Sequence, residues 1–297
     1  MGSDAAVAET VGLIGLGLVG KAMIARLVPA GWTVLGWDID SGARELAADL
    51  GAQIAEDAPA AAREVRTLLL SLPDSAVVTR ALWQEGIGDA LQPGATVLDT
   101  STGTPADARS NHARLAERGV RFVDVTLSGS SEQIARGEAA AMVGAPAAEA
   151  DYCDVIERFA STIFLLGEPG HGCLAKLVVN LVMGVNRAAL AEGLALGERA
   201  GLDSALLLEV LRGSAAYSRV MDMKGERMVQ RDYAPASRIA QHAKDVRLIL
   251  ELAEELGAHT PLQRAHAEVL RAAIDAGLVD ADNAALIEVF RQAEERE

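Results

Sequence analysis

The feature that most constrains this chain is a glycine pattern placed between two apolar strand patterns near the amino end. An apolar run over 11–14 leads into Gly15-Leu16-Gly17-Leu18-Val19-Gly20, and a helical apolar pattern follows over 23–28. A second strand pattern over 33–37 then ends at Asp38. A GxGxxG motif alone is weak evidence. In the order strand, turn, helix, strand and acid it predicts a dinucleotide-binding βαβ unit.

Each part of this unit has a physical role toward a dinucleotide. The glycines permit a tight turn, close approach of the pyrophosphate and packing of the helix on the strand, while the helix N-terminus receives the phosphates. An acid at the end of the second strand hydrogen-bonds the adenosine ribose and repels a 2′-phosphate, so Asp38 favours NAD over NADP. The alternative is that Asp38 is a turn residue that caps the next helix. The expected cofactor contacts are Gly15, Leu16, Gly17, Leu18, Val19, Gly20 and Asp38.

The remaining patterns divide the chain into two parts. Further strand patterns lie at 66–71, 96–99, 121–125, 139–143 and 162–166. Strand patterns stop after Gly167, and helices are expected at about 173–200, 203–213, 216–230, 236–256, 261–276 and 282–294. Alternation of strands and helices is typical of a parallel sheet. The sequence therefore predicts an α/β Rossmann-type domain over 1–167 followed by an all-α domain over 168–297.

Several polar or small residues follow directly after predicted strands. Ligands of open parallel sheets bind at the carboxyl ends of the strands, so Leu72, Pro73 and Thr102 are expected to contact the cofactor. The composition of 101–105 would serve helix capping equally well. The loop expected at 126–131 has small residues that suit binding of an anion by backbone amides, and a plain linker is an equal interpretation.

The stretch 170–187 predicts an apolar helix that carries two polar side chains. Lys176 and Asn180 are four residues apart, so they project from one face, and a helix apolar all round is normally buried on all sides. The helix N-terminus and partial desolvation are both expected to lower the pKa of Lys176 toward the range useful for proton exchange. A lysine that snorkels to water at the helix edge is the alternative.

Lysine is scarce in this chain, which favours a functional Lys176. Four of the 27 basic residues are lysines (Lys21, Lys176, Lys224 and Lys244), so arginine supplies most of the positive charge. Arginine stays protonated and does not exchange protons near neutral pH. A lysine kept in such a chain is expected where arginine would not work.

Composition excludes several classes of partner. The net charge of −15 argues against nucleic acid and anionic membrane surfaces, although a local basic pocket can still hold a small anion. We see no signal peptide pattern and no uncharged apolar run of membrane-spanning length, and therefore expect a cytoplasmic protein without a membrane span. The two cysteines form no CxxC pair, and the five histidines show no metal-ligand spacing, so no disulfide framework and no metal are expected.

Together these motifs resemble the β-hydroxyacid dehydrogenases, the family of 3-hydroxyisobutyrate dehydrogenase and tartronate semialdehyde reductase. The resemblance runs from Val11 to about Leu252. It is carried by the GxGxxG turn, Leu72-Pro73-Asp74, Asp99-x-Ser101-Thr102-x-x-Pro105, Gly170-x-Gly172-x-x-x-Lys176-x-x-x-Asn180 and Lys244-Asp245. It implies that Lys176 is catalytic, that Ser128, Gly129, Ser130 and Asn180 contact the substrate, and that Lys244 closes over the nicotinamide. A homodimer or homotetramer is usual in this family.

Several positions depart from the family pattern. The family's substrate loop commonly runs Pro-Val-Ser-Gly-Gly, whereas here it is Thr126-Leu127-Ser128-Gly129-Ser130. Ser130 replaces the second glycine of the substrate loop, and Leu181 stands where a second asparagine is frequent. His242 stands where an apolar residue is usual, and Ser237 lies where phenylalanine is often found. Lys176 argues against the imine-reductase branch, in which that lysine is replaced. These departures leave the reaction class in place and leave the substrate open. His242 and Ser237 favour a substrate more polar than a branched-chain acid.

The resulting hypothesis is an NAD-dependent dehydrogenase that moves hydride between the cofactor and C3 of a small, anionic β-hydroxyacid or the corresponding semialdehyde. Lys176 would act as general acid and base. Two alternatives remain: a catalytically silent dinucleotide-binding scaffold that kept the fold, and an NADPH-dependent reductase of an aldehyde acid, which Asp38 opposes. The sequence does not select the substrate, its stereochemistry or the preferred direction.

Overall fold

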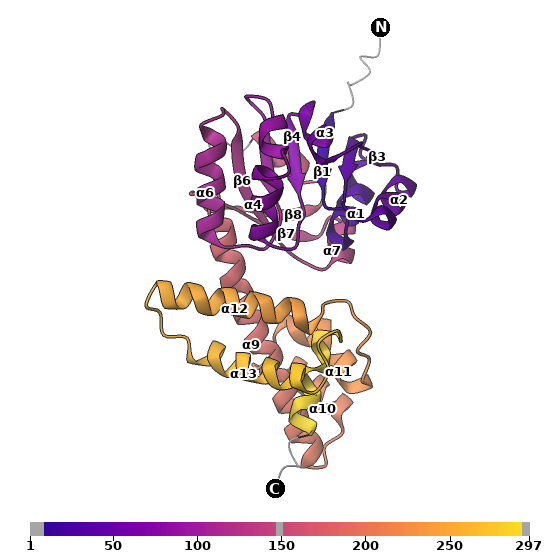
Figure 1. Ribbon diagram of the computed structural model, residues 1–297. Helices are drawn as coiled ribbons and strands as arrows, with labels where there is room; N and C mark the ends of the chain where they lie inside the picture. Colours follow the sequence, from indigo (N-terminus) through magenta and orange to yellow (C-terminus); the bar gives the residue numbers. More distant parts are fainter. Residues whose placement is uncertain (1–8, 147–150, 293–297) are drawn as a thin grey trace. The chain divides into compact units, whose positions relative to one another are not determined.

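The computed structural model describes residues 9–146 and 151–292, and the chain forms two compact units, Met1–Lys176 and Leu177–Glu297 (Figure 1). The division falls inside helix α9 (His171–Arg199), whereas the boundary predicted from the sequence lies before that helix, at 167/168. The start of α9 belongs to the first unit because the Asp124 carboxylate accepts the backbone N–H groups of Gly170 and Cys173, each at 2.8 Å.

The first unit is built on an eight-stranded sheet in the order β3-β2-β1-β4-β5-β6-β7-β8. Neighbouring strands pair in parallel, except that β6 and β7 are antiparallel. The strands are β1 (Thr10–Ile14), β2 (Thr33–Trp37), β3 (Gln53–Ile54), β4 (Thr67–Leu70), β5 (Thr96–Asp99), β6 (Arg121–Ser128), β7 (Ala139–Val143) and β8 (Ala160–Leu165). The order reverses between β1 and β4, which places a topological switch point there. The predicted Rossmann-type fold is confirmed.

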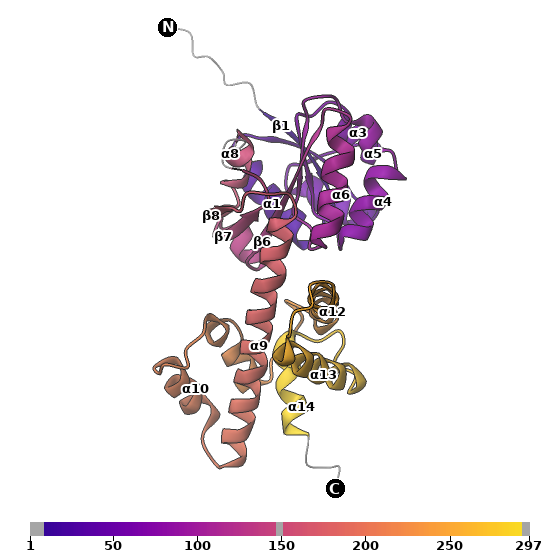
Figure 2. The ribbon, with the colours of Figure 1, turned by 90° about the vertical axis from the view of Figure 1, so that its left-hand side faces the viewer.

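Helices cover both faces of this sheet. They are α1 (Leu18–Leu27), α2 (Ser41–Asp49), α3 (Ala58–Arg63), α4 (Ser75–Trp83), α5 (Ile87–Ala90), α6 (Pro105–Ala116), α7 (Ser131–Ala135) and α8 (Cys153–Ile156). Figure 2 shows α3, α4, α5 and α6 on one face and α1 and α8 on the other. Each face has its own apolar core, since alternate residues of the central strands point to opposite sides. Strands buried on both faces explain the near-continuous apolar runs in the sequence.

One prediction about this unit is wrong. A loop was expected over 126–131, but β6 continues through Ser128. Its last residues pair with β7, with Thr126 opposite Met142 and Ser128 opposite Ala140. The antiparallel return of β7 supplies these backbone partners, and Thr126 also donates its hydroxyl to the carbonyl of Gly172 at 2.7 Å. Both contacts come from segments distant in sequence, which the local composition does not report.

The second unit is helical, as predicted. It contains α9 from Leu177 onward, α10 (Ser204–Arg212), a π-helical turn (Met221–Gly225), α11 (Glu226–Gln230), α12 (Ile239–Glu255), α13 (Pro261–Asp275), a 3-10 turn (Asn283–Leu286) and α14 (Ile287–Arg291). The helix predicted over 216–230 is wrong at its start. The Ser214 hydroxyl accepts the N–H of Ala216 and donates to the carbonyl of Leu211, which forms a turn instead.

Helix α9 is less buried than its apolar sequence predicts. Leu177 and Ala191 are buried, but Val178 and Val182 on another side of the helix are 53% and 51% exposed. The expectation of burial on every side is therefore wrong for the single chain. By length and composition alone α9 could cross a membrane, a test that the core helix of a globular protein also passes.

Candidate functional site

The loops singled out from the sequence lie at one edge of the sheet. Because β1, β2, β4, β5 and β6 run in parallel, their carboxyl ends share that edge. It therefore gathers the glycine turn after β1, Asp38 after β2, Leu72-Pro73 after β4, Thr102 after β5 and Gly129 after β6. A ligand at the switch point between β1 and β4 would meet the first three of these.

The three motif glycines have different reasons to lack a side chain. Gly15 has φ +95°, and a Cβ there would lie 2.2 Å from the Ser71 carbonyl oxygen. A Cβ on Gly20 would lie 2.1 Å from the Gly15 carbonyl oxygen, so helix α1 approaches the turn closely. A Cβ on Gly17 would meet nothing within 4 Å in the described part of the chain. Packing explains Gly15 and Gly20, whereas Gly17 leaves open space at the start of α1, where a pyrophosphate fits.

Asp38 is held against the glycine turn. One carboxylate oxygen accepts the N–H of Leu16 at 2.6 Å, and the other accepts the N–H of Asp40 at 2.9 Å. Helix α2 is capped by Asp40, whose side chain accepts the N–H of Gly42, so the alternative that Asp38 caps the next helix is wrong. The Asp38 carboxylate is thus fixed where the second strand ends.

Arg44 is a neighbour of Asp38 that the sequence argument missed. Its guanidinium lies 4.6 Å from the centre of the Trp37 ring and donates to the backbone carbonyl of Asp38 at 2.6 Å. Arginine in this region can accommodate the 2′-phosphate of NADP, whereas an acid repels it. Arg44 lies six residues after Asp38 on helix α2, and nothing in the sequence pattern there indicates this contact.

The loops after β4 and β5 are tied together. Leu72 donates its N–H to the Ser101 hydroxyl at 2.9 Å, and Thr100 donates its hydroxyl to the carbonyl of Leu70 at 2.7 Å. Helix α6 is capped by Thr104 rather than by Ser101. Thr102, next to Ser101, is half-buried. Hydrogen bonds therefore hold two of the expected cofactor segments together.

Below these loops, two carboxylates are buried side by side. Asp99 and Asp124 are register partners on β5 and β6 and are 4% and 0% exposed. Burial raises the pKa of Asp99 to about 7, although Ser101 donates hydrogen bonds that oppose the rise. Burial and the nearby carboxylates also raise the pKa of the Cys173 thiol. Asp124 fastens the first turn of α9 to the sheet, so it orients the helix that carries Lys176. The sequence could have indicated this role of Asp124, because a carboxylate inside the apolar run of β6 is buried and therefore requires hydrogen-bond partners.

The expected substrate loop is smaller than its sequence suggested. Ser128 ends strand β6, and only Gly129 and Ser130 lie between β6 and α7. Ser130 caps α7: its hydroxyl accepts the N–H of Gln133 at 3.3 Å, and its own N–H donates to the Gln133 side chain at 2.9 Å. The Ser130 amide is therefore already used, while its hydroxyl hydrogen can still serve a ligand.

Lys176 lies in the second turn of α9 and is half-buried, and Asn180 follows one turn later and is 2% exposed. Asn180 donates its side-chain N–H to one oxygen of Asp245 at 3.0 Å, and the Lys244 amine lies 3.4 Å from the other oxygen. Lys176 and Lys244 both make polar interactions. The structure thus connects two expected site residues, Asn180 and Lys244, through Asp245.

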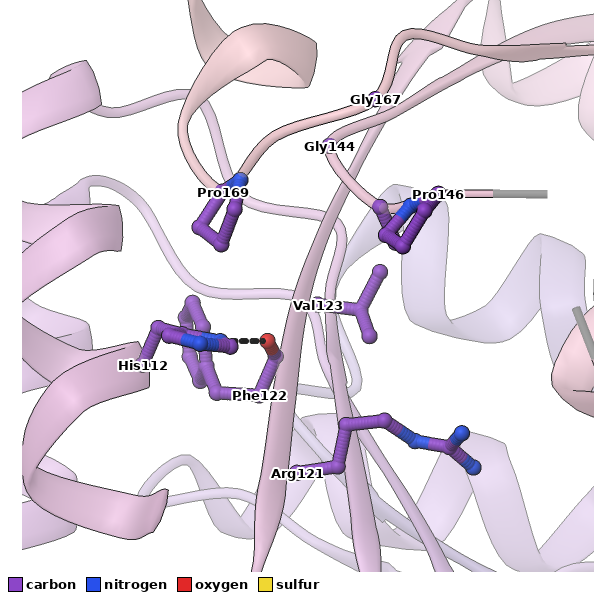
Figure 3. Close-up of a pocket in the computed structure, with 9 residues that line it drawn as sticks. His112, Arg121, Phe122, Val123, Gly144, Pro146, Gly167 and Pro169 are labelled. Atoms are coloured by element: carbon purple, nitrogen blue, oxygen red, sulfur yellow. Dashed lines mark hydrogen bonds between the residues drawn. The ribbon is translucent and has the colours of Figure 1, made fainter. Parts of the chain in front are cut away.

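The hollow drawn in Figure 3 lies elsewhere. It has a volume of about 200 Å³ and is lined by residues that include His112, Arg121, Phe122 and Pro169. Arg121 and Phe122 begin β6, so the hollow lies at the sheet edge opposite the glycine turn. His112 there contacts the Phe122 carbonyl at 3.0 Å through Nδ1. Among the described residues, no group of three or more His, Cys, Asp or Glu side chains is arranged to hold a metal ion.

Two family models together match most of the chain. Residues 10–167 match the NAD binding domain of 6-phosphogluconate dehydrogenase. Residues 170–290 match a domain described as NAD-binding of NADP-dependent 3-hydroxyisobutyrate dehydrogenase. The two matches meet in the segment that precedes α9.

Similar proteins are named as dehydrogenases and reductases. An L-threonate dehydrogenase of Escherichia coli (strain CFT073) is 31% identical over 284 residues, which cover 94% of each chain. A 2-hydroxy-3-oxopropionate reductase of Escherichia coli (strain K12) is 29% identical, covering 94% of this chain and 96% of the relative. Among solved structures, Mycobacterium tuberculosis 3-hydroxyisobutyrate dehydrogenase with L-serine superposes with a TM-score of 0.87 at 29% identity, covering 96% of this chain and 100% of that one.

Proposed function

The chain belongs to the β-hydroxyacid dehydrogenase family, and on that premise we propose that it transfers hydride between a nicotinamide dinucleotide and C3 of a small β-hydroxyacid or its semialdehyde. The observation that carries the proposal is the match along nearly the whole chain to relatives named for this chemistry. The scaffold hypothesis has no such support, because those relatives are dehydrogenases and reductases.

The residues at the switch point fit a dinucleotide. The open space at Gly17 and the N-terminus of α1, which has no side-chain cap, suit a pyrophosphate, and the Asp38 carboxylate suits the ribose hydroxyls. Leu72, Pro73 and Thr102 would line the next part of the same edge. When bound, the nicotinamide supplies the hydride acceptor or donor.

NAD is the proposed cofactor, with NADP less favoured. Asp38 supports this choice, because its carboxylate is fixed at the end of β2 and would repel a 2′-phosphate. Arg44 is the opposing influence, since its guanidinium lies beside the same position. An initial-rate comparison with NAD and NADP, followed at 340 nm, tests the preference. A higher kcat/KM with NADP would contradict it.

Lys176 is the proposed general acid and base. Its amine would accept the hydroxyl proton as hydride leaves C3 and would return that proton in the reductive direction. Asn180, one turn further along α9, would orient the substrate, and Ser128, Gly129 and Ser130 would contact its anionic group. The link from Asp124 to the first turn of α9 supports a fixed position for Lys176.

Substitution of Lys176 tests this role. Lys176→Ala and Lys176→Arg are both expected to lose about 10²–10⁴ in kcat, the usual contribution of a positioned acid or base, with NAD affinity little changed. The measurements are kcat on a panel of 3-hydroxy acids and NAD binding by calorimetry. Near-normal turnover by Lys176→Arg would exclude proton transfer by this residue, because arginine does not exchange protons near neutral pH.

A homodimer or homotetramer is also proposed. Large apolar side chains on α9 and α10 support it: Leu196, Leu206 and Val210 are 69%, 65% and 57% exposed in the single chain. Apolar patches of this kind mark protein interfaces. Light scattering after gel filtration measures the assembly, and a monomer at micromolar concentration would contradict the proposal.

A further inference from the structure

A buried group of polar side chains lies between α9, α12 and α13 and has no role in the function proposed above. Arg187, Gln263 and His266 are 3%, 1% and 2% exposed. Among the described residues, the Arg187 Nε and Nη1, both amide atoms of Gln263 and both ring nitrogens of His266 have no hydrogen-bond partner. The same holds for Oδ1 of Asn180, which is 2% exposed. These four residues are called the Arg187 cluster below.

The cluster is continuous along one face of α9. Asn180, Gly184 and Arg187 are spaced by four and three residues, so they share that face. A Cβ on Gly184 would lie 2.6 Å from Cε1 of His266, which places the imidazole against α9 between Asn180 and Arg187. Gln263 is one turn before His266 on α13, on the same face. The ring of His242 from α12 lies 5.1 Å from that of His266.

Electrostatic coupling joins the two ends of the cluster. Burial, and then the positive charge of Arg187, lowers the pKa of His266 to about 4, so His266 is neutral near pH 7. Burial lowers the pKa of Arg187 to about 10, and the carboxylates of Asp282 and Asp245 oppose that effect. Asp245 is also the carboxylate that accepts the hydrogen bond from Asn180. Arg187 is therefore coupled electrostatically to the carboxylate that holds Asn180.

Such a cluster needs partners. A buried donor or acceptor without a hydrogen bond costs roughly 1–3 kcal/mol, and more when it is charged. Apolar residues of similar size would give an equally good or better core at these positions. The cluster therefore lowers the stability of the folded chain when it is empty. A polar ligand that supplies the missing hydrogen bonds would remove that cost.

The kinds of atoms left over select the ligand. Arg187 and the Gln263 nitrogen can only donate, whereas the Gln263 oxygen can only accept, and a neutral imidazole offers one of each. Asn180 offers an acceptor, because the carboxylate of Asp245 holds its amide nitrogen and so leaves Oδ1 over. A hydroxyl group both donates and accepts, a carboxylate only accepts, and an alkyl group does neither. A chain of hydroxyl groups matches this mixed set best.

We propose that the Arg187 cluster is the subsite for a hydroxylated substrate tail, so that the substrate is a polyhydroxylated acid of the aldonate class rather than an alkyl-substituted 3-hydroxy acid. This inference rests on the proposed function, since Asn180 lies one helical turn from Lys176. In the proposed complex, Asn180 Oδ1 accepts a hydrogen bond from the tail hydroxyl nearest the reacting carbon. Arg187, Gln263 and His266 bind the hydroxyls beyond it. Asp245 is a positioning residue that fixes the orientation of the Asn180 amide.

The test compares matched acids of five and six carbons, each as its polyhydroxylated form and as the 3-hydroxy form that lacks the other hydroxyls. The readout is the ratio of the two kcat/KM values within each variant. The wild-type protein is expected to favour the polyhydroxylated acid. Arg187→Met is expected to lower that ratio by about 10- to 100-fold, the effect of losing hydrogen bonds to a charged group. Gln263→Leu, which removes no charge, is expected to lower it by about tenfold.

Controls separate this role from a structural one. Arg199→Met changes an exposed arginine at the end of α9 and is expected to keep the wild-type ratio. If Arg187→Met and Gln263→Leu shift thermal stability but keep the wild-type ratio, the cluster holds internal water and the proposal is wrong. A wild-type preference for the 3-hydroxy forms also overturns it.

Binding keeps the test independent of turnover. The same acids are titrated calorimetrically into NAD-loaded Lys176→Ala with and without Arg187→Met. Selective weakening of the polyhydroxylated acid by Arg187→Met supports the subsite even if no acid is oxidised, in which case hydride transfer is the part that fails. Turnover without any such selectivity retains the enzyme and rejects the subsite.

Discussion

Asp99 makes the stability of the first unit depend on pH in an unusual direction. Its pKa is raised from 3.8 to about 7, mainly because burial disfavours the charged form. Between about pH 4 and pH 7 the native carboxyl keeps a proton that the unfolded chain has lost. The native state then binds more protons, so the free energy of unfolding falls as pH rises through this window. The stabilisation is complete below pH 4 and lost above pH 7.

The size of the effect follows from the shift. Three pKa units at a little over 1 kcal/mol each give roughly 4 kcal/mol in all, of which roughly 3 kcal/mol falls between pH 5 and pH 8. Asp99→Asn keeps the shape and an oxygen that can accept the Ser101 N–H, but it does not titrate. The variant is therefore expected to gain roughly 3 kcal/mol relative to the wild-type protein as the pH is raised from 5 to 8.

Urea unfolding of the cofactor-free protein at several pH values measures this gain. All three tryptophans (Trp32, Trp37 and Trp83) lie in the first unit, so their fluorescence reports its unfolding separately from the second. Asp49→Asn, at an exposed carboxylate of the same unit, is the matched control and is expected to follow the wild-type curve. A difference between Asp99→Asn and wild type that stays constant from pH 5 to pH 8 would refute the buried, protonated state of Asp99.

Four further variants test the cofactor edge and the start of α9. Gly17→Ala is expected to keep the melting temperature and to weaken NAD binding, measured by calorimetry, about tenfold or more. Gly20→Ala is expected to lower the free energy of unfolding of the first unit in urea by more than about 1 kcal/mol, because its Cβ would lie 2.1 Å from a carbonyl oxygen. Equal NAD affinity in Gly17→Ala would argue against phosphates at this turn. Asp38→Ser, which leaves Arg44 in place, is expected to raise the NADP-to-NAD ratio of kcat/KM about tenfold or more, and an unchanged ratio would remove Asp38 from cofactor selection. Asp124→Asn replaces one acceptor oxygen by an NH2 group, which then faces one of the two N–H groups, of Gly170 or Cys173, that Asp124 accepts. The variant is expected to lower the free energy of unfolding in urea by about 1–3 kcal/mol and to lower kcat. Full activity with full stability would show that these two hydrogen bonds are not needed.

The sequence alone determined the features whose causes are local. Gly15 and Gly20 leave no room for a Cβ where β1 turns into α1, and these two positions lie close together in the sequence. Apolar periodicity likewise located most strands and helices and the change to an all-helical part after 167, because burial of one helix face or of a whole strand repeats along the chain. The fold class and family followed from these patterns.

Only the tertiary structure decided which distant segments supply the partners of buried polar groups. Ser128 belongs to a strand because β7 returns beside it, and Asp124 accepts the N–H of Gly170, 46 residues later, just before α9 begins. Asn180 presents an acceptor because Asp245, 65 residues away, takes its donor. Periodicity reports that a residue is buried but not which atom faces it, since hydrogen bonds depend on direction and on segments that meet only after folding. For the same reason Arg187, Gln263 and His266 gave no signal in the sequence, because they lie on two helices, α9 and α13, that meet only in the folded chain.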